Sequence, residues 1–160
     1  MSRRAADRIV DRVRAASVAE AWRQTGERVV VCRGIFDLLA VGHVRRLAEA
    51  RRSGDRMVVL IHDDAEAARL GGAGRPVLAA RDRAALVAAL RGVDLVTVVE
   101  EPAMDEWVRG WGPAIDVGGA ESRAGAPASP VTESGPDPGL EAHTSAALVA
   151  RVRQRYRGRP

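Results

Sequence analysis

The sequence predicts an α/β fold, a doubly wound parallel sheet of the Rossmann-like kind, with all 160 residues in a single domain. Short apolar, β-branched runs alternate along the chain with segments of helical periodicity, as they do in α/β proteins. The runs are continuously apolar, which is typical of parallel strands covered by helices on both faces. The length suits one domain of ordinary size, and the sequence has no internal repeat.

The first half of the chain predicts two buried strands with helices around them. The strands are indicated by β-branched residues, and the helices by apolar residues at a spacing of three and four. The expected elements are a helix over 5–24 within an N-terminal segment 1–25, a strand over 28–32, a helix from about His43 ended by Gly54-Asp55, a strand over 56–61, a helix over 65–70 and a glycine-rich loop over 71–76.

The second half continues the alternation and then changes in composition. Proline, glycine, alanine and serine are concentrated in one segment, which predicts a long loop. The expected elements are a helix over 81–91, a strand over 93–99, a helix from about Pro102 that holds Trp107 and Trp111, a strand over 114–117 closed by Gly118-Gly119, the loop over 120–139 and a last helix over 145–156.

Composition excludes several classes of function. All 25 basic residues are arginine, so Schiff-base chemistry and a Walker lysine are absent. The single cysteine excludes a disulfide framework. Acidic residues are interspersed with the arginines and the net charge is only +4, so we expect no nucleic-acid partner. No apolar run approaches the ~20 residues that span a bilayer, and no secretory signal is evident, so we expect a cytoplasmic protein without a membrane partner.

The carboxyl edge of the expected sheet is the place for a ligand, because doubly wound sheets bind ligands there. Residues 33–43, 62–64, 118–119 and 143–145 fall at this edge. Gly42 allows a phosphate to approach the backbone closely. His43 opens a helix, where free N–H groups and the helix dipole favour an anion. The sequence therefore predicts a phosphate site built without a Walker or GxGxxG motif.

An ordered series of motifs extends this prediction over residues 28–152. The series resembles the HxGH nucleotidylyltransferases, a cytidylyltransferase-like family. Within it the sequence is most similar to the adenylyltransferase domain that makes ADP-heptose from heptose 1-phosphate, and to the related glycerol-3-phosphate cytidylyltransferases. The motifs are Arg33-Gly34-Ile35-Phe36-Asp37-Leu38-Leu39-Ala40-Val41-Gly42-His43, Gly54-Asp55, residues 70–76 ending in Arg75-Pro76, residues 83–90, Val93-Asp94, residues 117–120 and Thr144-Ser145-Ala146.

The resemblance implies a reaction and a set of residues. A nucleoside triphosphate binds with Mg²⁺, the phosphate of a small substrate such as a sugar 1-phosphate attacks the α-phosphorus, and pyrophosphate leaves. It also implies a homodimer. His43 and Arg75 are the implied catalytic residues, and no residue is assigned as a metal ligand. The implied nucleotide- and phosphate-binding residues are Gly34, Phe36, Asp37, Gly42, His43, His62, Arg75, Gly118, Gly119, Thr144 and Ser145.

This sequence departs from the family pattern at positions where the family has histidine or lysine side chains. Ala40 stands where the family has its first histidine, and Gly71 and Val117 stand where it has lysines. Loss of one preorganised donor costs about 10²–10³ in rate. Candidate replacements are Arg33, Arg45, Arg75, Arg123 and His62.

These departures leave alternatives open. One is a catalytically silent nucleotide- or phosphate-binding homologue, and another is an enzyme that uses His43 and His62 for different chemistry. Asp37 can shape the turn rather than touch ligand, and Thr144-Ser145 can simply cap the last helix. Histidine and carboxylate are usual metal ligands, although no spacing here requires a metal site; the residues that could form one are His43, His62, Asp63, Asp64 and His143.

Overall fold

The computed structural model describes residues 4–100, 103, 106, 110, 114–116 and 145–156. Its centre is a parallel sheet of four strands in the order β3-β2-β1-β4, as expected for a doubly wound fold. The order reverses beside β1, so the switch point lies at the carboxyl ends of β1 and β4. The strands are β1 (Val29–Gly34), β2 (Arg56–His62), β3 (Leu95–Val99) and β4 (Ala114–Asp116).

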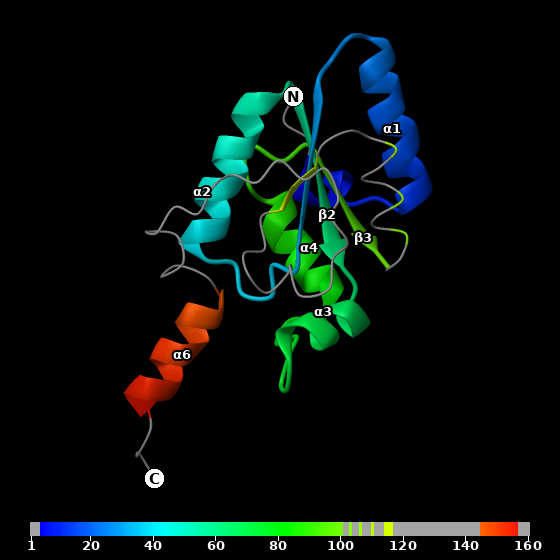
Figure 1. The fold of residues 1–160 in the computed structure, drawn as a ribbon. Coiled ribbons are helices and arrows are strands. Elements are labelled where there is room, and N and C mark those ends of the chain that lie inside the picture. The colour runs from blue at the N-terminus through cyan, green and yellow to red at the C-terminus, as the bar shows by residue number, and fades with distance from the viewer. Residues whose placement is uncertain are drawn as a thin grey trace.

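Helices cover both faces of this sheet (Figure 1). None of the helices in the described residues is both long and apolar enough to cross a membrane. The expected loop over 120–139 and most of the expected helix after Pro102 lie outside those residues. The helices are η1 (Ala5–Arg8), α1 (Arg12–Gln24), α2 (Val41–Ala50), η2 (Arg51–Ser53), α3 (Asp64–Gly71), α4 (Ala80–Ala88) and α6 (Ser145–Tyr156).

Two apolar layers hold the helices to the sheet. Alternate residues of a strand face opposite sides, so β2 contributes to both layers. Met57, Val59 and Ile61 pack with α2 and α4, whereas Val58 and Leu60 pack with α1. All five side chains are fully buried. This double burial explains why β2 reads as a continuous apolar run.

The N-terminal segment departs from the prediction of one helix over 5–24. Ile9 forms a parallel bridge with Val96, and the Val10 N–H donates to the Val96 carbonyl at 3.0 Å. The Asp11 side chain then accepts from the Arg14 N–H at 2.8 Å and begins α1. The prediction was wrong at 9–11 because an edge contact with β3 and a new N-cap interrupt the helical periodicity.

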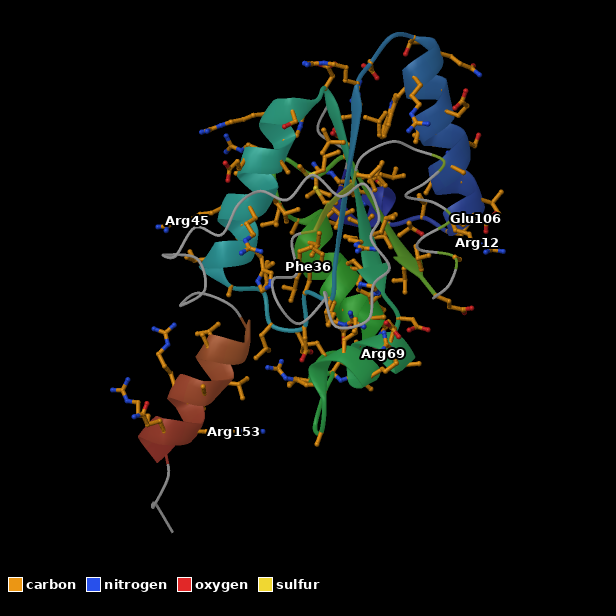
Figure 2. The ribbon with its side chains drawn as sticks, viewed as in Figure 1. Arg12, Phe36, Arg45, Arg69, Glu106 and Arg153 are labelled. Carbon is orange, nitrogen blue, oxygen red and sulfur yellow. The ribbon has the colours of Figure 1, made fainter. Side chains whose placement is uncertain are left out.

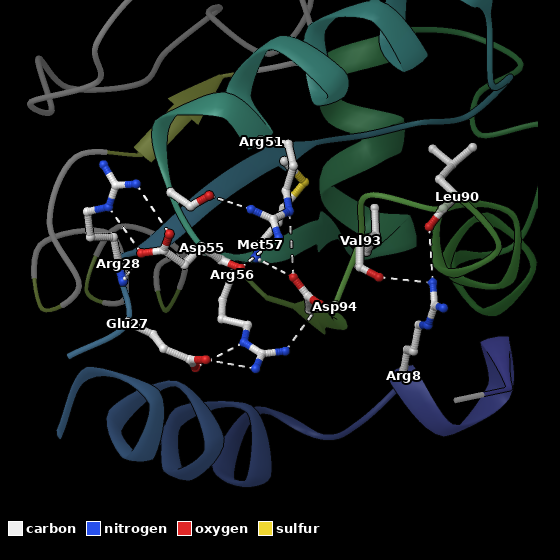
Figure 3. Close-up of polar contacts among 11 residues, drawn as sticks. Arg8, Glu27, Arg28, Arg51, Asp55, Arg56, Met57, Leu90, Val93 and Asp94 are labelled. Atoms are coloured by element: carbon white, nitrogen blue, oxygen red, sulfur yellow. Dashed lines mark hydrogen bonds and ion pairs between the residues drawn. The ribbon is translucent and has the colours of Figure 1, made fainter. Parts of the chain in front are cut away.

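Paired charges occupy the amino edge of the sheet (Figure 3). Arg56 pairs with Glu27 at 2.8 Å and with Asp94 at 3.7 Å. Asp94 also accepts from the Met57 N–H at 2.9 Å, and Arg8 donates to the carbonyl of Val93 at 3.0 Å. These contacts join segments that are distant in sequence, so the charged residues of this edge stabilise the fold. The polar chemistry available for a ligand lies at the opposite edge.

Candidate functional site

The site is built from the loops that leave β1 and β2 at the carboxyl edge. Gly34 ends β1, and the chain then turns through Phe36, a buried residue whose φ of 55° is uncommon for any residue but glycine. The turn delivers Ala40 to the N-cap of α2. Such a conformation is maintained by the surrounding structure and is typical of functional loops.

His43 lies in the first turn of α2, where the sequence predicts an anion site. Its side chain is buried, and its ring packs against Phe36 with centroids 5.6 Å apart. Nδ1 accepts a hydrogen bond from the Ala40 N–H at 3.0 Å. The neutral ring therefore carries its proton on Nε2. Burial, and then the charge of Arg46, lower the pKa of His43 to about 4. At neutral pH the residue is an uncharged hydrogen-bond donor.

Ala40 shares this helix terminus with His43. Its methyl group cannot cap the helix, and its carbonyl accepts from the His43 N–H at 3.0 Å. The His43 ring fills the reciprocal role that a glutamate has in a capping box. Ala40 stands where the family resemblance leads us to expect a first histidine. This position is buried, and its backbone N–H is hydrogen-bonded to the His43 ring.

Asp37 anchors a second loop to the site. Its Oδ1 accepts from the N–H groups of Val77 at 2.7 Å and Leu78 at 2.9 Å, and its Oδ2 pairs with Arg75. The carboxylate is almost fully buried. Asp37 therefore shapes the loops, one of its two sequence-based interpretations. Arg75 is brought to the site, with its positive charge shared with Asp37.

The sequence analysis missed Arg83 as a site residue. This side chain is fully buried and donates to the carbonyls of Ile35 at 2.6 Å, His62 at 2.9 Å and Leu78 at 3.0 Å. It also pairs with Asp64 at 2.7 Å. One guanidinium therefore joins the loops after β1 and β2 to the loop before α4. The available signal was its place on the helical stripe that buries Ala84, Val87 and Ala88.

The end of β2 holds the other predicted polar residues. His62 is buried at 3% exposure. Asp63 caps α3 by accepting from the Glu66 N–H at 2.8 Å. The pKa of Glu66 is lowered, mainly by its hydrogen bond from Arg69 and slightly by His62. Within the described ranges, no group of three or more His, Cys, Asp or Glu side chains is arranged to hold a metal ion.

The candidate arginines differ in where their side chains lie. Arg33 is buried near the end of β1, in register with Asp116 of β4. Arg45 is exposed and projects away from α2 (Figure 2), whereas the adjacent Arg46 is buried. Gly42 is buried in the first turn of α2, and Ser145 is the first residue of α6. The predicted residues outside the described ranges are Gly118, Gly119, Arg123, His143 and Thr144.

An apolar groove of about 730 Å³ adjoins the site loops. It runs between those loops, α4 and α6, and opens to solvent. Its lining residues are Leu38, Leu39, Leu78, Leu86, Leu148, Val149, Val152 and Arg153.

The low pKa of His43 predicts a pH-dependent stability. The unfolded chain takes up a proton near the ordinary pKa of 6.5, whereas the folded chain resists it until about pH 4. The stabilisation is complete above pH 6.5 and is lost as the pH falls towards 4. We expect about 2 kcal/mol of unfolding free energy to be lost between pH 7 and pH 5.

Urea unfolding of the wild type and of His43→Gln at both pH values measures this loss. The variant should lack the His43 contribution, so the difference between the two proteins isolates it from other titrating groups. Equal pH dependence in both proteins would contradict the assignment.

Comparison with known proteins shows the family of this chain. Residues 31–153, well over half of the chain, match the sequence profile of the family described as cytidylyltransferase-like. The chain is 43% identical over 114 residues to "Bifunctional protein HldE" of Acidiphilium cryptum, covering 71% of this chain and 24% of that protein. It is 43% identical over 107 residues to the protein of the same name in Gluconobacter oxydans, covering 67% and 22%.

A solved structure extends the match to three dimensions. The lipopolysaccharide core biosynthesis protein from Thermoplasma volcanium superposes with a TM-score of 0.51 and 32% identity, covering 57% of this chain and 73% of that one. The chain spans about a quarter of the length of the curated relatives. The matched residues include most of β1, the turn at Phe36, α2 and the Arg75 loop, so this chain belongs to the cytidylyltransferase-like family.

Proposed function

We propose that this chain is a nucleotidylyltransferase that transfers a nucleotidyl group from a nucleoside triphosphate to a small phosphorylated substrate, such as a sugar 1-phosphate, and releases pyrophosphate. The observation that carries the proposal is the buried, neutral His43 at the amino end of α2, on the fold of this family. Neither the silent homologue nor the enzyme of different chemistry is favoured by the family match.

The protein forms no covalent bond to the substrate in this reaction. The attacking phosphate oxygen forms a bond to the α-phosphorus as the bond to the pyrophosphate oxygen breaks, and negative charge builds on the leaving group. The His43 Nε2–H and the first amides of α2 donate to the phosphate oxygens. Asp37 and Arg83 hold the loops around them, and Arg75 adds positive charge.

Mg²⁺ is proposed to enter with the triphosphate rather than to occupy a protein cage. Three carboxylates among the described side chains of this edge already have partners: Asp37 holds the Arg75 loop, Asp64 pairs with Arg83, and Glu66 pairs with Arg69. Mg²⁺ usually binds through one or two carboxylates, waters and substrate phosphates. When bound, it would neutralise phosphate charge.

The proposal is tested by pyrophosphate release. The purified chain is incubated with Mg²⁺, each of ATP, CTP, GTP and UTP, and a panel of sugar 1-phosphates that includes heptose 1-phosphate. We expect turnover that requires both substrates and that falls about 10²–10³-fold in His43→Gln. The exposed Val44→Gln on the same helix is the matched control and should keep its activity. Absence of turnover with every pair would overturn the proposal.

We propose further that the protein is a homodimer, as the family resemblance implies. The apolar groove beside α6 supports a contact between copies, because Leu86 and Val152 there are 44% and 55% exposed. Light scattering should give twice the monomer mass, and Val152→Glu should lower it. A wild-type monomer at assay concentration would contradict this proposal.

A further inference from the structure

Arg46 occupies an unusual place for an arginine. The inner face of α2 is formed by Gly42, His43, Arg46, Leu47 and Ala50, which are all buried, while Arg45 on the outer face is exposed. Arg46 is only 9% exposed. It lies three residues after His43, so the two side chains share one face of the helix.

The position of Arg46 on α2 favours a side chain that leans towards the amino end of the helix. Long helical side chains lean back over the preceding turn, here the turn that holds Gly42 and His43. The effect of Arg46 on His43 agrees with this direction, because its positive charge is the second cause of the low pKa of that imidazole. The guanidinium therefore adds positive charge near the Val41 and Gly42 N–H groups, which precede the first hydrogen-bonded amide of α2.

Arg46 also differs from the other arginines of this edge in its partners. Arg69, Arg75 and Arg83 each pair with a carboxylate. Among the residues that the structure describes, Arg46 forms no hydrogen bond or ion pair. No Arg46 nitrogen is among the buried polar atoms that lack a partner in the described part of the chain, so the guanidinium keeps contact with solvent and is open to an anion.

We propose that Arg46 is a phosphate-binding residue, which holds a phosphate group against His43 and the amino end of α2. The inference rests on the proposed function and names the cation that makes up for Ala40 and Gly71, where the family resemblance leads us to expect positive groups. The phosphate belongs either to the nucleotide and its pyrophosphate product or to the acceptor. The sequence analysis named Arg45 rather than Arg46 as a candidate replacement, whereas the structure exposes Arg45 and buries Arg46.

Binding of two probes tests the proposal. Inorganic pyrophosphate represents the nucleotide side, and glucose 1-phosphate represents the acceptor. Calorimetry measures affinity, and the ring signals of the three histidines, assigned with His43→Gln, report contact at the site. Wild type is compared with Arg46→Gln, Arg46→Lys and the matched control Arg45→Gln, which removes the same charge from the adjacent exposed position.

We expect Arg46→Gln to bind one probe at least about 10-fold more weakly than wild type, as for loss of one charge-assisted hydrogen bond. Arg46→Lys should recover part of the affinity, and Arg45→Gln should bind as wild type does. The His43 signal should move with ligand in wild type and respond less in Arg46→Gln. The affected probe identifies which phosphate Arg46 holds.

A stability measurement separates this role from a structural one. Without ligand, Arg46→Gln should have a melting temperature close to that of wild type, because the substitution removes no hydrogen bond or ion pair among the described residues. A structural arginine would give a lower one. Added pyrophosphate should then stabilise wild type more than the variant.

Two results would overturn the inference alone. One is wild-type affinity in Arg46→Gln for both probes, and the other is an equal loss in Arg45→Gln, which would indicate only general surface charge. If Arg46→Gln binds both probes with wild-type affinity while wild type releases pyrophosphate, the proposed function is supported and the role of Arg46 is contradicted. If wild type binds neither probe and releases no pyrophosphate, the proposed function and the role of Arg46 are both contradicted.

Discussion

Arg83→Met is expected to lower the free energy of unfolding by about 3–5 kcal/mol, because the carbonyls that the guanidinium serves lose their donor, at about 1–3 kcal/mol for each buried one. The guanidinium is fully buried and serves the carbonyls of Ile35, His62 and Leu78 together with the Asp64 carboxylate. Methionine fills a similar volume and donates no hydrogen bond. Three loops of the site would lose their common anchor.

Urea unfolding of Arg83→Met against wild type measures the effect. Arg81→Met is the matched control, because Arg81 lies on the same helix with its side chain 87% exposed and pairs with its neighbour Asp82. The control should stay within about 0.5 kcal/mol of wild type. Equal stability of the two variants would show that the Arg83 contacts contribute little. We also expect any folded fraction of Arg83→Met to bind pyrophosphate weakly, because the loop at Phe36 loses its support.

Ala40→His is expected to raise kcat/KM for pyrophosphate release by about 10²–10³-fold, the usual value of one preorganised donor. Position 40 is the N-cap of α2 with an extended backbone, φ −113° and ψ 163°, which any residue adopts. It is buried and bonded through its backbone to His43. A histidine there would place a second imidazole at the helix terminus that carries the proposed phosphate site.

Steady-state kinetics with the best substrate pair measures this gain. Val41→His is the matched control: it adds the same side chain at the next residue, which is 50% exposed, and it should leave the rate unchanged. A folded Ala40→His protein with wild-type activity would contradict the expectation. It would indicate that other groups, Arg46 first among them, already supply the missing charge.

Much of the fold was readable from local pattern. The apolar runs predicted β1, β2, β3 and β4, and the periodicity predicted α2, α3, α4 and α6. Such patterns depend on the spacing of apolar residues along the chain, which can be taken directly from the sequence. The prediction failed at Ile9–Asp11, where a contact with β3 overrides helical spacing.

The candidate site likewise has features that the sequence predicted and features that only the tertiary structure shows. The sequence by itself predicted a helix beginning near His43 at the carboxyl edge, because strand, glycine and helix follow one another within a few residues, and in the structure His43 lies in the first turn of that helix. Only the tertiary structure decided that Arg46 turns inward, that Asp37 holds a loop some forty residues away, and that Arg83 joins three loops. These roles depend on which face of a helix meets the sheet and on contacts between distant segments. Both are settled by packing of the whole domain, which no local pattern encodes.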